Sequence, residues 1–188
     1  MNTPTHIVFG ACLAYGIASR FIPDDATRTR KVGLGALIVG AGVLSHLGLD
    51  LMPHYAWVVY LNGLENLPYD WLVREALFGL ALAVPAFRLA REQWPYVALG
   101  MAGGMYPDIE KVAALDFHVP DAYILFDWHS TKLSNRTGGL PLSVLIVIEV
   151  ILIALALGAM GFIRRNTLSY SPEAPEPDSE QRGVQQRP

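Results

Sequence analysis

The chain has 188 residues, about the length of one domain, and 52% of them are hydrophobic while only 16% are charged. Soluble domains carry about 25% charged residues, so this composition favours a membrane protein. A net charge of −3 argues against a nucleic-acid partner, which would require a basic surface. The single cysteine, Cys12, excludes an intrachain disulfide and a cysteine-based zinc cluster.

Five apolar stretches are predicted to cross a membrane, because about 20 helical residues span the ~30 Å hydrocarbon layer. In chain order they are residues 7–22, 32–52, 72–90, 94–114 and 142–163. The fourth stretch is the least apolar, since it contains Asp108, Glu110 and Lys111. The first lacks the positively charged start of a signal peptide, so we expect it to be retained as a helix.

The fold class predicted from this pattern is all-α, a polytopic membrane helix bundle of about five helices over residues 1–165. Residues 166–188 are rich in Pro, Glu, Ser and Gln, which cannot build a core, and are predicted to form a disordered tail. Two glycine-rich stretches, residues 33–42 and 100–104, are typical of helices that approach one another closely.

Basic residues predict the orientation of the bundle, because cytoplasmic loops of membrane proteins carry an excess of Lys and Arg. Eight of them fall on one side of the predicted spans: Arg20, Arg28, Arg30, Lys31, Arg88, Arg91, Arg164 and Arg165. The pattern predicts a multi-pass protein of the inner (plasma) membrane, with the N-terminus outside and the C-terminus in the cytoplasm.

A polar stripe interrupts the end of the second apolar stretch. His46, Asp50 and His54 are four residues apart and share one helix face. A straight helix would separate His46 from His54 by about 12 Å, but Pro53 disfavours helix at the preceding residue and would let His54 turn back. Asp50 and His54 could then share one ion, with His46 as a further ligand or as a partner that orients a ligand. A packed structural stripe is the alternative, although intramembrane ionisable residues are functional by default.

The predicted orientation brings further candidates to the same outer face, namely His6, Asp108 and His129. Imidazole and carboxylate groups without thiolates suit a divalent metal ion, with zinc favoured and manganese or iron possible. We expect Asp50, His54 and either His6 or His129 to bind it, with Asp108 as a further ligand or the general base. Three protein ligands would leave a position open for chemistry.

Glu149 is a further ionisable residue inside a predicted span, about 10 Å below the outer end of the last one. A contact with His46, at a similar depth, would satisfy both groups and could support catalysis by orienting a metal ligand. A hydrogen-bonded, protonated carboxylic acid with a packing role is the alternative.

Thr5-His6, then His46-x3-Asp50-x2-Pro53-His54, then Pro107-Asp108-Ile109-Glu110 resemble the motifs of a family of bacterial inner-membrane metal-dependent hydrolases. The resemblance covers about residues 3–130. It implies a metal-dependent hydrolytic activity and six polar-site positions: His6, His46, Asp50, His54, Asp108 and His129.

The sequence therefore predicts a membrane hydrolase that uses a divalent metal to cleave an ester or phosphoester bond. A site at the outer membrane boundary favours a lipid or lipid-linked substrate. The rival hypothesis is a non-enzymatic membrane protein, either a scaffold or an ion or proton carrier, whose polar cluster is structural. Membrane lipid is the expected partner in either case, and the oligomeric state is left open.

Overall fold

The computed structural model describes residues 3–22, 26–54, 70–116, 118–120, 123–126 and 139–169. This part of the chain contains α-helices and one short 3₁₀ helix, and no strand. The α-helices are α1 (Thr3–Phe21), α2 (Arg28–Asp50), α3 (Asp70–Leu89), α4 (Trp94–Asp116) and α6 (Leu142–Ser169), with η2 (Arg91–Gln93) between α3 and α4. The all-α class is thereby confirmed, and each of the five apolar stretches is helical.

Local signals explain several helix boundaries. Thr27 caps α2, since its hydroxyl accepts a hydrogen bond from the Arg30 N–H at 3.4 Å. At the other end, α2 stops at Asp50 rather than at Met52, because Pro53 disfavours helix in the residue before it. His118 takes a left-handed conformation (φ 55°) just after α4. The last helix, α6, continues to Ser169, past the Asn166 at which the sequence predicts the tail to begin.

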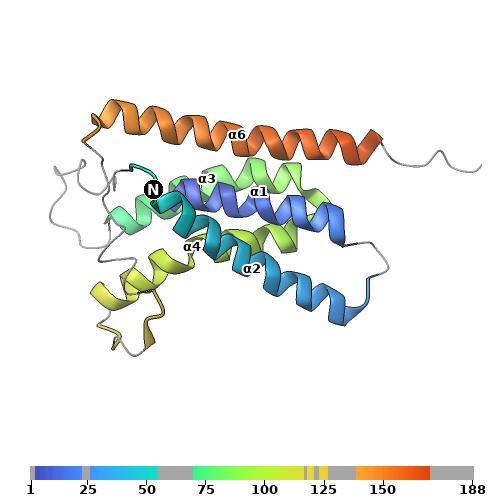
Figure 1. Ribbon diagram of the computed structural model, residues 1–188, viewed down its shortest axis with the longest axis horizontal. Helices are drawn as coiled ribbons and strands as arrows, with labels where there is room; N and C mark the ends of the chain where they lie inside the picture. The colour runs from blue at the N-terminus through green and yellow to red at the C-terminus, as the bar shows by residue number, and fades with distance from the viewer. Residues whose placement is uncertain are drawn as a thin grey trace, which may run out of the picture.

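The helices run alternately up and down a bundle, with α1 at its centre (Figure 1). Helix α1 packs against α2, α3, α4 and α6, while α6 lies over α1 and α3. The starts of α1, α3 and α6 lie at the same end of the bundle as the ends of α2 and α4 (Figure 1). We call this the site end, because the candidate site described below lies there.

The core is built from small and medium apolar side chains around α1. Ile7, Ala11 and Tyr15 of α1 are buried against Val97 and Met101 of α4, together with residues of α3 and α6. In water, burial of apolar area would drive such packing at about 25 cal/mol per Å². Inside lipid that force is absent, and close van der Waals contact between helices takes its place.

Glycines allow α1, α2 and α4 to approach one another at backbone distance. A Cβ atom on Gly10 or on Gly42 would collide with the carbonyl of Gly100. A Cβ atom on Gly103 would collide with the carbonyl of Val39, and one on Gly104 would press on the carbonyl of His6. We call these five residues (Gly10, Gly42, Gly100, Gly103 and Gly104) the glycine seam. The sequence prediction was wrong for Gly33 and Gly40, because a Cβ atom at either would meet nothing within 4 Å.

Two helices of the described chain are long and apolar enough to cross a membrane, namely Arg28–Asp50 and Leu142–Thr167. Only 28% and 17% of their most apolar windows are buried, so neither is an ordinary core helix of a soluble protein. The other helices of the described residues do not meet this standard. Charged residues explain part of that result, since α4 contains Asp108, Glu110 and Lys111.

Replacing Gly42 by alanine tests the glycine seam. A Cβ atom there would lie 2.6 Å from the Gly100 oxygen and 2.9 Å from the Gly104 nitrogen. We expect a loss of about 1–3 kcal/mol in the free energy of unfolding, as for other overpacked sites. The matched control is Gly40→Ala on the same helix, which should be neutral or gain up to about 1 kcal/mol. Thermal melts in detergent compare the two, and equal melting temperatures would contradict the seam.

Candidate metal centre

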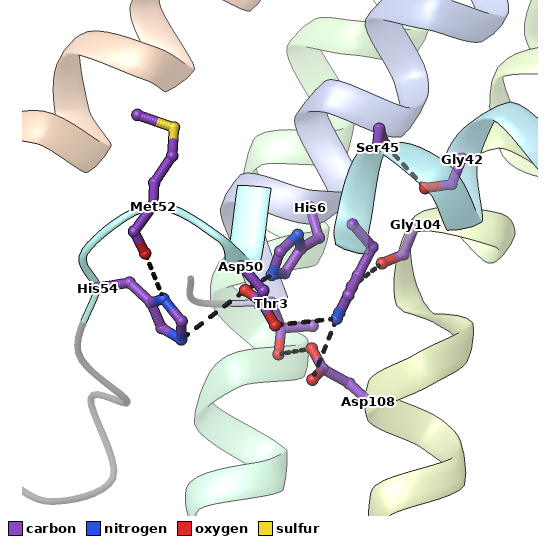
Figure 2. A network of polar contacts seen from close by, with 10 residues as sticks. Thr3, His6, Gly42, Ser45, Asp50, Met52, His54, Gly104 and Asp108 are labelled. Carbon is purple, nitrogen blue, oxygen red and sulfur yellow. Dashed lines mark hydrogen bonds and ion pairs between the residues drawn. The ribbon is translucent and has the colours of Figure 1, made fainter. Parts of the chain in front are cut away.

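Histidine and aspartate side chains from three helices meet at the site end of the bundle. His6 lies in the first turns of α1, His46 and Asp50 in the last turns of α2, and Asp108 in α4. Figure 2 shows His6, Asp50, His54 and Asp108 pointing toward one another. Both imidazoles on helices, His6 and His46, are fully buried, and Asp50 and His54 are each 3% exposed.

Three of these residues could hold one metal ion. Ligand atoms of His6, His46 and Asp108 all lie within 4.8 Å of one another. The imidazole rings of His6 and His46 stack with their centroids 3.6 Å apart, which brings their nitrogens to one place. Asp108 is held by Thr3, whose hydroxyl donates to its Oδ2 at 3.1 Å. The identity of the metal is not determined by this donor set.

Asp50 lies against all three histidines. Its Oδ1 is 3.1 Å from His6 Nε2 and 3.8 Å from His54 Nε2, and its Oδ2 is 3.4 Å from His46 Nε2. The prediction that His54 turns back toward Asp50 is confirmed by the 3.8 Å distance. The cause is the early end of α2, after which the chain turns through Leu51 and Met52 (Figure 2).

A backbone carbonyl fixes the orientation of the His46 ring. His46 Nδ1 lies 2.7 Å from the Gly104 oxygen, which can only accept a hydrogen bond, so Nδ1 carries the proton. In a neutral imidazole Nε2 then carries the lone pair, and this nitrogen faces Asp50 and, at 3.8 Å, Asp108 Oδ1. An imidazole whose second nitrogen donates to a carbonyl is the usual arrangement of a metal-ligating histidine.

The charges in the cluster also favour a cation. Two carboxylates face His46 Nε2, and Asp50 is almost completely buried. Burying a charge without compensation costs several kcal/mol per ion. A divalent cation would balance the two carboxylates while leaving the histidines neutral, the form in which they bind metal. The donor set therefore fits a divalent metal ion.

The two remaining candidates from the sequence are His129 and Glu149. His129 lies outside the described residues. Glu149 is buried on α6, 6% exposed, and α6 packs against α1 and α3; a contact with His46 stays a prediction. The sequence predicts that His46 lies deeper than the ion, as a further ligand or as a partner that orients a ligand. In the structure, its Nε2 lies 3.4 Å from Asp50 Oδ2 and 3.8 Å from Asp108 Oδ1.

The structure adds contributors that the sequence analysis did not single out. Thr3 holds Asp108, and the carbonyls of Gly104 and Met52 hold the rings of His46 and His54. Every residue has a backbone carbonyl, so the sequence does not show which ones contact a histidine ring. A threonine at the start of a helix is too common to indicate a contact with a site residue.

In comparisons with known proteins, no protein-family model, curated protein or solved structure matches the chain.

Removing a ligand should remove the metal. Detergent-purified protein is expected to hold a transition metal, measured by elemental analysis, and His46→Ala and Asp108→Asn should each lower metal affinity at least about 10–100-fold. The matched controls are His118→Asn, an exposed histidine whose left-handed backbone asparagine tolerates, and Glu92→Gln, an exposed carboxylate in η2. Wild-type protein that stays metal-free after incubation with zinc or manganese would contradict the metal centre.

Proposed function

We propose that the protein is a multi-pass membrane hydrolase that uses a divalent metal to cleave an ester or phosphoester bond of a lipid or lipid-linked substrate. The observation that carries the proposal is the buried group of His6, His46 and Asp108, whose ligand atoms lie within 4.8 Å of one another. The sequence resemblance to inner-membrane metal-dependent hydrolases points the same way. Zinc is the favoured metal, with manganese and iron as the other candidates.

Exposed apolar side chains support placement in a membrane. Leu37 and Leu44 on α2 are 56% and 70% exposed, and Val150 and Leu155 on α6 are 59% and 63% exposed. Apolar surface on this scale would be a liability in water and is expected against lipid. Although only α2 and α6 are apolar enough by themselves, α1, α3 and α4 lie lengthwise beside them in the same bundle (Figure 1), so we propose that all five helices cross the bilayer.

The position of the cluster favours a substrate at the membrane surface. His46 and Asp50 lie in the last turns of α2, and His6 in the first turns of α1. If these helices span the bilayer, the cluster lies near the boundary between hydrocarbon and water, where the ester and phosphoester bonds of lipids are found. A bound divalent metal supplies Lewis-acid polarisation of the bond and lowers the pKa of water at the site.

We assign the following roles to the residues of the cluster. His6, His46 and Asp108 hold the metal, so Asp108 acts as a ligand rather than as the general base. The Gly104 carbonyl and Thr3 hold His46 and Asp108 in the geometry of the site. Asp50, which contacts His6 and His46, balances charge beside them.

The distribution of buried polar groups weighs against the ion or proton carrier. In the described chain, every buried histidine, aspartate and glutamate belongs to the half of the bundle at the site end: His6, His46, Asp50, His54, Glu110 and Glu149. A carrier needs polar groups through the whole depth of the membrane. A one-sided cluster fits chemistry at one surface.

Hydrolysis can be measured with metal-loaded protein on phospholipids and on neutral lipid esters. We expect release of product by the wild type and a fall of about 1,000-fold in rate for Asp108→Asn, since a metal supplies several kcal/mol of transition-state stabilisation. Glu92→Gln should retain the wild-type rate. Stoichiometric metal without turnover on either substrate class would leave a metal-binding membrane protein and overturn the hydrolase.

Reporter fusions test the proposed orientation in the inner membrane. Green fluorescent protein fused after Pro188 should fluoresce and alkaline phosphatase there should be inactive, because the excess of Lys and Arg at one side of the helices predicts a cytoplasmic C-terminus. Alkaline phosphatase fused after Gly139, ahead of α6, should be active. The reverse pattern would put the metal centre on the cytoplasmic face.

A further inference from the structure

Two histidine–aspartate pairs in the cluster share the same geometry. His46 Nε2 lies 3.8 Å from Asp108 Oδ1, and His54 Nε2 lies 3.8 Å from Asp50 Oδ1. In each histidine the other nitrogen, Nδ1, contacts a backbone carbonyl, that of Gly104 at 2.7 Å and that of Met52 at 2.8 Å. The first pair belongs to the proposed metal site, and the second repeats its arrangement.

Neither pair has the geometry of a hydrogen bond. Because each Nδ1 donates to a carbonyl, Nε2 of the neutral ring carries a lone pair directed at a carboxylate oxygen. A separation of 3.8 Å also exceeds the usual 2.7–3.2 Å of an N–H···O bond. Two ligand atoms that are each about 2.0–2.2 Å from a metal ion can be up to about 4.2 Å apart, so an ion fits between the members of each pair.

Asp50 is placed to serve two ions. Its Oδ2 lies 3.4 Å from His46 Nε2 and its Oδ1 lies 3.1 Å from His6 Nε2, and both histidines are ligands of the first ion. His54 lies beside the oxygen that is not paired with His46, since its Nε2 is 3.8 Å from Oδ1. We propose that Asp50 and His54 form a second divalent cation site, with the Asp50 carboxylate bridging the two ions. This inference rests on the first metal ion of the proposed function and extends it to a two-metal centre, whose ions lie about 3.5–4 Å apart.

The charge of such a centre indicates its substrate. Two divalent ions carry four positive charges, while Asp50 and Asp108 carry two negative ones, so the loaded cluster is cationic. An anionic substrate balances this excess, and two-metal centres act on phosphoesters by holding the attacking and leaving oxygens. The second ion therefore binds more weakly than the first and is stabilised by phosphate. Between the two bond types of the proposed function, this favours the phosphoester.

Manganese titration of the detergent-solubilised full chain tests the second site. Electron paramagnetic resonance counts the bound ions at equilibrium and reports exchange coupling through a bridging carboxylate. We expect the wild type to bind two ions with a coupled spectrum, the second one more tightly when inorganic phosphate is present. His54→Ala and His54→Gln should bind one uncoupled ion with unchanged affinity, and His118→Asn should match the wild type.

The outcomes separate this inference from the proposed function. A wild type that binds one ion with or without phosphate, or His54 variants that still bind a coupled pair, would overturn the second site and leave the first intact. A wild type that binds no manganese or zinc at all would overturn both. Retention of the first ion by the His54 variants also shows that they fold, so their loss of the second ion is not a folding defect.

Discussion

The close approach of α1, α2 and α4 is the constraint on which the site depends. Each helix supplies part of the cluster: α1 His6, α2 His46 and Asp50, and α4 Asp108. Contact between these side chains requires closely packed helices, and the glycine seam sets a short distance between the three backbones because a Cβ atom at its positions would collide with a neighbouring backbone. Gly104 belongs to both the glycine seam and the cluster. Its lack of a side chain lets α1 pack close to α4, and its carbonyl accepts a hydrogen bond from the His46 ring.

The packing of the helices buries the Asp50 carboxylate, and this burial favours the binding of a cation. Asp50 is 3% exposed and lies against three imidazoles, an arrangement that is costly unless a proton or a cation compensates it. The Gly104 and Met52 carbonyls place protons on Nδ1 of His46 and His54, so that Nε2 of each ring faces the carboxylates. The backbone thereby prepares the ligand atoms before any ion arrives, and less reorganisation is needed on binding.

Much of this arrangement can be predicted from the sequence. The apolar stretches are long, and their ends are marked by charge, proline and glycine, so all five helices are where hydropathy places them. Assigning sides from Lys and Arg alone brought His6, Asp50, His54 and Asp108 to one end, where the structure also has them. The direction of a helix follows from its order in an up-and-down chain, and the residues near its ends follow from that direction.

The register of the helices and their rotation about their axes could not be predicted from the sequence. Which glycines form contacts depends on how each helix is turned about its axis, so Gly42 and Gly40 look alike in the sequence yet differ in the bundle. The same rotation brings His46 between Asp50 and Asp108, and it brings the ligand atoms of His6, His46 and Asp108 within 4.8 Å of one another. The sequence by itself determined the helices, their alternation and the end at which the polar residues gather. Only the tertiary structure decided which atoms meet, because contacts over a few ångströms depend on packing between segments far apart in the chain.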